Sequence, residues 1–135
     1  MINLYANICR YAQICRQGLL ELHMENEAAI FKVLADATRL RLAVLLSIQG
    51  ETCVCALAEA LDAPEYKISR HLGIMRAAGV VEAHREGTWM YYQLSKARNR
   101  LEVCLQACFR DCLADHETIE EDLERLQKAS CKAGQ

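Results

Sequence analysis

Two cysteines separated by one residue, Cys53 and Cys55, are the pattern in this sequence best suited to do chemistry. Thiolates are soft donors that select thiophilic ions such as arsenic(III), antimony(III), cadmium, lead, zinc or copper(I). In an ideal helix, residues two apart point about 200° away from each other. Both sulfurs can therefore bind one ion only if the turn distorts or lies at the start of the helix. This conflict suggests that ion capture strains the helix that carries the pair.

A cluster of polar and basic side chains follows the cysteine pair. It comprises Tyr66, Lys67, Ser69, Arg70 and His71. Donors and acceptors on the exposed, early part of a helix can reach base edges in the major groove of DNA. We assign Ser69 and His71 to base-edge or phosphate contacts. Lys67 and Arg70 are neighbours on one helix face and are assigned mainly to phosphates. Taken alone, such a cluster is more often a solvated, charged helix face.

A hairpin is expected after this helix. Two runs of β-type residues, 80–81 and 89–94, are separated by a turn at residues 85–87 that contains a glycine. His84 and Arg85 at the tip suit minor-groove or backbone contacts with DNA. The aromatic residues Trp89, Tyr91 and Tyr92 are interpreted as core and hairpin pairs rather than base-stacking groups. The hairpin would be the wing of a winged helix.

Apolar residues at helical spacing predict four helices around these groups. They cover residues 28–35, 36–50, 52–61 and 64–79. Asp36 can cap the second helix, and Gly50 ends it. Pro64 suits the first turn of the fourth helix, because its missing N–H would lack a partner there anyway. The third and fourth helices, joined by a short turn, are typical of a helix-turn-helix reader of DNA.

The C-terminal part is predicted to form one long helical tract over residues 98–128. Its apolar stripe has no obvious partner within so small a fold, so its expected partner is another copy of the chain. The stripe is Leu101, Cys104, Leu105, Cys108, Cys112, Ile119, Leu123 and Leu126. The predicted fold is therefore mostly α with a small β-hairpin, a winged helix-turn-helix that is dimeric through terminal helices. Two-fold symmetry would place two reader helices about one turn of DNA apart.

Composition and charge set limits on the kind of protein. The 135 residues carry a net charge of −2, with seven basic against five acidic residues over 56–100 and four against eight over 101–135. A mildly basic reader beside an acidic tail is compatible with DNA binding. No apolar run approaches the roughly 20 residues of a membrane span, and Arg10 and Arg16 interrupt any signal-peptide core. A cytoplasmic location is expected, where the eight cysteines stay reduced and serve as metal ligands or core residues.

Several motifs in this order resemble the ArsR/SmtB family of winged-helix, metal-responsive repressors, specifically its arsenic-sensing branch. They are ETCVC at 51–55, KISRHL at 67–72, GVV at 79–81 and REGTWMYY at 85–92, preceded by ADATRLRL at 35–42. The resemblance covers residues 28 to about 95. It implies a homodimer formed by terminal helices, with ion binding at the Cys-Val-Cys helix releasing the protein from DNA.

The chain departs from the family pattern at one position. Some arsenic sensors carry a third cysteine three residues after the pair, where this chain has Ala58. A three-sulfur site would need another donor, and Cys9 and Cys15 are the first candidates, since the family's cadmium/lead sensors bring an N-terminal pair onto this helix. The second candidates recur every four residues: Cys104, Cys108 and Cys112. The outer two lie about 12 Å apart along a helix, and packing in the core or at a dimer interface is favoured for all three.

The leading interpretation is a repressor that leaves double-stranded operator DNA when trivalent arsenic or antimony binds to cysteine thiolates. The alternatives are a cadmium- or lead-responsive repressor of the same fold and a thiol redox switch. No cysteine stands in a nucleophilic pattern with histidine and an acid, so an enzyme is not expected. The expected organisation is an N-terminal extension with helical spacing of its apolar residues over 1–24, a DNA-binding domain over 25–98, and a dimerisation helix with an acidic tail over 99–135. Met24 is an alternative start of translation.

Overall fold

A computed structural model describes residues 24–129 of the chain. Within them the predicted mostly α architecture with a small sheet is confirmed. The elements in chain order are α2 (Met24–Leu34), α3 (Ala37–Gln49), β1 (Thr52–Cys53), α4 (Val54–Ala60), α5 (Glu65–Ala77), β2 (Val81–Glu86), β3 (Trp89–Leu94), α6 (Arg100–Cys112) and α7 (Glu117–Lys128). The predicted N-terminal extension, with Cys9 and Cys15, lies outside the described residues.

The ends of α3 follow the sequence signals. The Asp36 carboxylate accepts a hydrogen bond from the backbone N–H of Arg39 at 3.1 Å, so the predicted cap is confirmed. Gly50 ends the helix with a φ of 80°, in the region that glycine adopts without steric cost. Pro64 stands at the N-cap of α5, one position before the first turn in which it was expected. These boundaries fix the direction of both helices that flank the cysteine pair.

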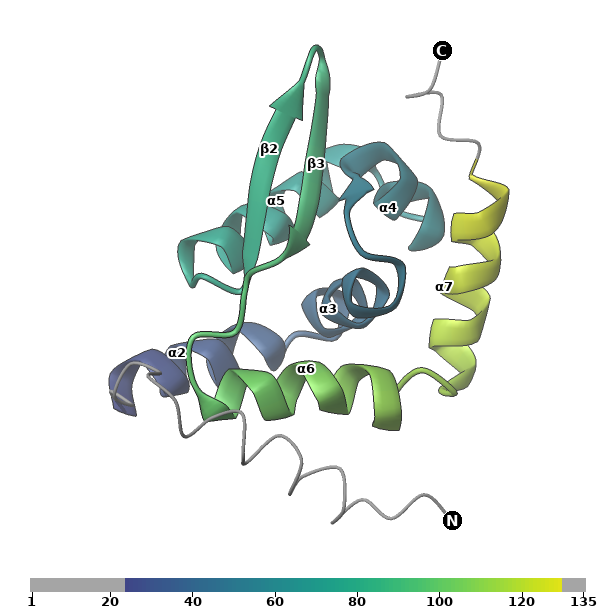
Figure 1. Ribbon diagram of the computed structural model, residues 1–135. Coiled ribbons are helices and arrows are strands. Elements are labelled where there is room, and N and C mark those ends of the chain that lie inside the picture. The colour runs from purple at the N-terminus through teal and green to yellow at the C-terminus, as the bar shows by residue number, and fades with distance from the viewer. Residues whose placement is uncertain (1–23, 130–135) are drawn as a thin grey trace.

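The sheet is antiparallel, in the order β1-β3-β2, and its two long strands form a hairpin that stands out from the helices (Figure 1). Strand β2 is longer than predicted. Arg85 and Glu86 belong to the strand, and Glu86 pairs with Trp89, so the turn consists of Gly87 and Thr88 rather than residues 85–87. Gly87 has a φ of 60°, as tight two-residue hairpin turns require.

The core lies between α3, α4 and α5. Its fully buried side chains include Leu42 and Leu45 from α3, Leu57 from α4, and Ile68 and Leu72 from α5. All five stand at the helical spacing read from the sequence, because one face of each helix must leave water. This packing fixes α5, the predicted reader, against the helix that follows the cysteine pair.

The C-terminal tract is not one helix. It turns a corner at residues 113–116 and forms α6 below α3 and α7 alongside α4 (Figure 1). Phe109, Ile119 and Leu126 are buried in the chain's own core. The expectation that the apolar stripe has no partner within one chain is therefore wrong for Ile119 and Leu126, the two buried members of the stripe. The reason is the corner, which lets α7 fold back across α4.

Candidate thiolate site and nucleic-acid interface

The two cysteines of the pair converge. Cys53 pairs with Tyr91 of β3 and is the N-cap of α4, with extended backbone at φ −74° and ψ 150°. Cys55 follows in the first helical turn, and the two Sγ atoms lie 2.7 Å apart. The predicted helix over 52–61 is thus wrong at its start. Because Cys53 precedes the helix, its side chain does not follow helical periodicity, and no helix distortion is needed to bring the sulfurs together.

The burial of the two sulfurs differs. Cys53 is fully buried, whereas Cys55 is half-buried and lines an open groove with Ala58, Pro64 and Glu65. Two sulfurs that bind one ion at about 2.3 Å each lie roughly 3.5 Å apart. An ion entering from the Cys55 side would therefore find both donors close to their binding distance. The groove runs along the turn between α4 and α5, so the thiolate site adjoins the reader helix.

The sheet connects the cysteine pair to the wing. Cys53 of β1 pairs with Tyr91 of β3, which pairs with His84 of β2. The His84 and Tyr91 rings are stacked with centroids 5.4 Å apart. His84 Nε2 lies 3.4 Å from a Glu51 oxygen and 3.3 Å from a Glu86 oxygen. These carboxylates surround His84 with negative charge, which opposes the phosphate contact predicted for it, while Arg85 is exposed on the same strand.

The predicted DNA-contacting residues of α5 fall into two groups that differ in solvent exposure. Tyr66, Lys67 and Arg70 are exposed. Ser69 and His71 are half-buried, and His71 faces α3, where its Nδ1 lies 3.5 Å from Arg39 Nη1 and 3.9 Å from the Asp36 carboxylate. The outward face is therefore available for phosphate contacts, and His71 is less accessible to DNA than the sequence suggested.

Two further residues on this face were missed by the sequence analysis. Gly73 and Ile74 follow Tyr66 and Arg70 at helical spacing and are exposed, Ile74 to 41%. A Cβ atom at Gly73 would meet no other atom of the protein within 4 Å. Glycine in a helix interior costs about 1 kcal/mol relative to alanine, and here the fold gives no steric reason for it. The exposed glycine leaves room on the outward face of α5 for close approach by another molecule. The signal was present in the sequence as the only glycine inside the predicted helix.

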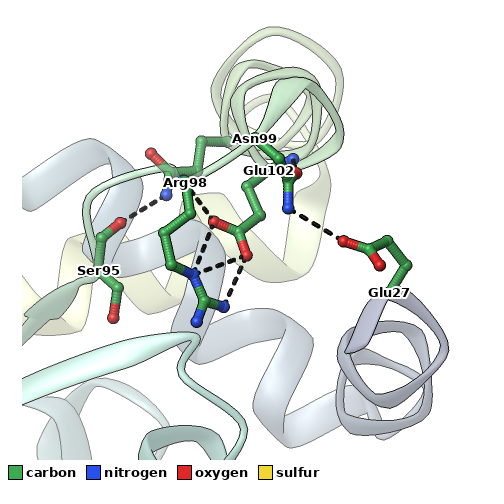
Figure 2. Close-up of polar contacts among 6 residues, drawn as sticks. Glu27, Ser95, Arg98, Asn99 and Glu102 are labelled. Atoms are coloured by element: carbon green, nitrogen blue, oxygen red, sulfur yellow. Dashed lines mark hydrogen bonds and ion pairs between the residues drawn. The ribbon is translucent and has the colours of Figure 1, made fainter. Parts of the chain in front are cut away.

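A buried polar network ties α2 to α6 (Figure 2). Asn99 Nδ2 donates to Glu27 Oε1 at 3.0 Å, and Asn99 Oδ1 accepts from the backbone N–H of Glu102 at 3.0 Å. The Glu102 carboxylate accepts from the backbone and guanidinium of Arg98, at 2.7 Å for Nη2, which raises the pKa of Arg98. Glu27, Asn99 and Glu102 are all buried. An asparagine three residues before a glutamate is a helix-start signal, and Asn99 is indeed the N-cap of α6.

A second buried network ties α7 to α3 and α4. The fully buried Asp122 accepts from Arg41 at 2.8 and 2.6 Å and from Arg125 at 2.5 Å. Arg125 also donates to the carbonyl of Ala60, the last residue of α4, at 2.7 Å. The hydrogen bond to Asp122 raises the pKa of Arg41. Helix α7 is thereby attached to the end of the helix that begins at the cysteine pair.

The fold is that of a winged helix-turn-helix protein, with a thiol pair beside the reader helix. The model of the family described as bacterial regulatory protein, arsR family, matches residues 36–83. The solution structure of a homodimeric winged helix-turn-helix DNA-binding domain from Mycobacterium bovis, a possible ArsR-family transcriptional regulator, is 32% identical. It aligns with a TM-score of 0.57 over 70% of this chain and 83% of that one. The chain belongs to the arsR family of bacterial regulatory proteins.

Two curated relatives have stated roles. An arsenical resistance operon repressor of Escherichia coli is 50% identical over 66 residues, which are 49% of this chain and 56% of that protein. A cadmium resistance transcriptional regulatory protein CadC homolog of Staphylococcus aureus is 37% identical over 79 residues, or 58% and 65% of the two chains. The chain thus spans little more than half the length of the first of these relatives. Between residues 24 and 129 no helix is long and apolar enough to cross a membrane.

Proposed function

We propose that this protein is a transcriptional repressor that binds operator DNA as a homodimer in the cytoplasm and is released by trivalent arsenic or antimony bound to Cys53 and Cys55. The observation that carries the proposal is the 2.7 Å separation of the two sulfurs at the start of α4. That helix directly precedes the reader α5. The arsenical resistance role of the Escherichia coli relative supports the choice of ion.

The DNA interface in this proposal is the outward face of α5 together with the wing. Tyr66, Lys67 and Arg70 are its exposed polar groups, and Arg85 would reach the backbone from the wing. We assign a smaller part in DNA binding to three residues that are less accessible or lie beside carboxylates: Ser69, His71 and His84. We propose that residues 25–98 bind DNA and that residues 99–135 support the dimer.

The proposed route of release starts from the geometry of the pair. An ion bonded to both sulfurs holds them at one fixed separation of roughly 3.5 Å, which constrains Cys55 relative to Cys53. Cys53 is fixed by its pairing with Tyr91, so the first turn of α4 must move. The far end of α4 leads into the turn before α5, and the two helices share the groove at Pro64. A shift of α4 therefore displaces the reader, and no unwinding of α4 is required. Cys9 and Cys15 remain candidates for a third sulfur.

Two alternatives use the same residues. A cadmium- or lead-responsive repressor is supported by the soft thiolate donors and by the Staphylococcus aureus relative. A redox switch is supported by the closeness of the sulfurs, since oxidation would join two thiols that already touch.

One DNA-release experiment separates the three functions. A fluorescent operator fragment, selected with this protein from random DNA, is titrated with arsenite, antimonite, Cd²⁺, Pb²⁺ and an oxidant, and anisotropy reports release. Our proposal requires release at the lowest concentration by arsenite or antimonite. Release by Cd²⁺ or Pb²⁺ alone, or by oxidant alone, would select the corresponding alternative.

A further inference from the structure

Three thiols on α6 take no part in the site described above. Cys104, Cys108 and Cys112 were expected to pack as small hydrophobic groups in the core or at a dimer interface. In the structure Cys108 and Cys112 are exposed and Cys104 is half-buried. The side of α6 that faces the core is instead formed by Glu102 and Phe109. Core packing therefore does not account for Cys108 and Cys112.

Cys108 and Cys112 face each other on the helix surface. Residues four apart lie on the same side of a helix, with Cβ atoms about 5–6 Å apart. Burial, followed by the influence of the neighbouring Cys112 and of Asp111, raises the pKa of Cys108. Cys112 is the last residue of α6, where fewer backbone hydrogen bonds resist adjustment of the sulfur position. The pair is thus a preformed, solvent-accessible dithiol.

Chelation of one thiophilic atom suits this geometry better than oxidation does. A disulfide needs Cβ atoms about 3.5–4.5 Å apart, closer than the roughly 5–6 Å that a regular helix provides. A bridging atom with bonds of about 2.3 Å to each sulfur tolerates a sulfur separation of roughly 3.5 Å. The helix can then remain intact.

We propose that Cys108 and Cys112 form a second dithiol site that binds trivalent arsenicals on the exposed surface of α6, separate from Cys53 and Cys55. With arsenous acid the reaction is a condensation: two S–H and two As–OH bonds break, two As–S bonds form, and two water molecules leave. Arsenic stays trivalent, so no oxidant or reductant takes part. Two sulfurs leave one hydroxyl on arsenic directed to solvent.

The position of the site predicts that it acts separately from DNA release. Helix α6 packs mainly against α3, whereas the reader α5 packs mainly against α4 and β2 and less extensively against α3. Cys108 and Cys112 are exposed on α6. Occupation of the α6 dithiol should therefore leave operator affinity unchanged. The site would capture an arsenical without releasing the repressor, and this inference does not depend on the function proposed for Cys53 and Cys55.

The test uses phenylarsine oxide, which condenses with two thiols and releases one water. The full chain is treated with the reagent under non-reducing conditions, digested with trypsin and examined by mass spectrometry. Cleavage after Arg100, Arg110 and Arg125 places Cys104 and Cys108 in the peptide 101–110 and Cys112 in the peptide 111–125. A Cys108–Cys112 chelate must therefore join these two peptides through one phenylarsenic group. A chelate of Cys104 with Cys108 would stay within peptide 101–110.

Variants complete the experiment. Cys108→Ser and Cys112→Ser should each abolish the joined peptides, whereas the matched control Cys104→Ser, one turn earlier on the same helix, should retain them. Cys53→Ser/Cys55→Ser should also retain them, which separates this site from the proposed function. Circular dichroism checks that each variant is folded. The proposal is overturned if the folded chain yields no joined peptides, or if Cys104→Ser removes them.

Discussion

At the scale of single residues, the difference in burial between Cys53 and Cys55 determines how an ion reaches the pair. Cys53 is fully buried and held in β1, while Cys55 is half-buried beside the open groove. An incoming ion should therefore meet Cys55 first and Cys53 second. A hydroxyl is a poor donor to a soft ion, so a serine at either position should weaken binding while keeping the size of the side chain.

Gly73 offers a test of the DNA interface at this scale. Gly73→Ala should raise the free energy of unfolding by about 0.5–1 kcal/mol, because alanine loses less backbone entropy in a helix, and its Cβ has free space. The same methyl group should weaken operator binding if the face closes on DNA. Thermal unfolding and operator anisotropy measure the two effects. Arg70→Ala is the control, since it should weaken operator binding without raising the free energy of unfolding. A stabilised Gly73→Ala variant with undiminished operator affinity would show that DNA does not approach this face closely.

Asp36 predicts a dependence of stability on pH. Burial acts to raise its pKa, but the hydrogen bond from the Arg39 backbone and the charges of Arg39 and His71 outweigh burial and hold the pKa below its ordinary range. A group whose pKa is lower in the folded state stabilises the protein at pH values above its unfolded pKa of about 3.9. This stabilisation is lost as the pH falls through the pKa of the folded state. Asp36→Ala should therefore cost about 1 kcal/mol at neutral pH.

Urea unfolding at pH 7 and at about pH 2.5 tests this prediction, since the difference between Asp36→Ala and the natural chain should shrink on acidification. Asp111→Ala, on the exposed side of α6, serves as the control and should show little difference at either pH. An Asp36→Ala deficit of equal size at both pH values would contradict the role of the charged carboxylate.

At the scale of elements, both ends of α3 were predicted correctly, whereas the hairpin turn, strand β1 and the corner before α7 were not. The Asp36 cap and the Gly50 stop depend on neighbours within four residues. The strand at Thr52–Cys53 exists because it pairs with Tyr91 and Tyr92, almost 40 positions away, and two residues carry no strand pattern of their own. The corner before α7 was missed for a different reason. It contains neither glycine nor proline, and its cap is His116, whose Nδ1 accepts from Thr118 N–H at 3.2 Å.

The buried Asp122 is expected to hold α7 against α3 and α4 through its bonds to Arg41 and Arg125. Asp122→Asn should lower the free energy of unfolding by about 2–3 kcal/mol, because it leaves Arg41 and Arg125 without their charged partner. This is less than the roughly 3–5 kcal/mol of a fully buried pair, since the arginines are 28% and 38% exposed. Urea unfolding measures the loss, with the exposed neighbour Glu121→Gln as the matched control. Equal stability of the two variants would rule out Asp122 as the attachment of α7.

At the scale of the whole molecule, the face left for a second copy is narrower than the sequence suggested. Ile119 and Leu126 of the C-terminal stripe are buried within the chain, and α2 exposes Met24 and Phe31, to 77% and 52%. Helix α2 is joined to α6 through the Glu27–Asn99 hydrogen bond (Figure 2). We infer that the exposed side of α2 forms the dimer face, in keeping with the homodimeric Mycobacterium bovis domain.

Phe31→Glu should therefore convert a dimer into a monomer at micromolar concentration and weaken operator binding, because a buried carboxylate without a partner is costly. Sedimentation velocity measures the oligomeric state. Ile48→Glu is the control, since it places the same charge on an exposed apolar position of α3 and should leave the dimer intact. A natural chain that sediments as a monomer, or a Phe31→Glu variant that remains dimeric, would refute this face.

An ion held by Cys53 and Cys55 is proposed to release the protein from DNA. An arsenite titration of the operator complex, monitored by anisotropy, tests this release for the natural chain and for Cys53→Ser/Cys55→Ser. We predict that both proteins bind the operator equally well without arsenite and that arsenite weakens binding of the natural chain by about 100-fold, or roughly 2.7 kcal/mol. The double variant should remain bound. Normal release of the folded double variant by arsenite would contradict the assignment of the site.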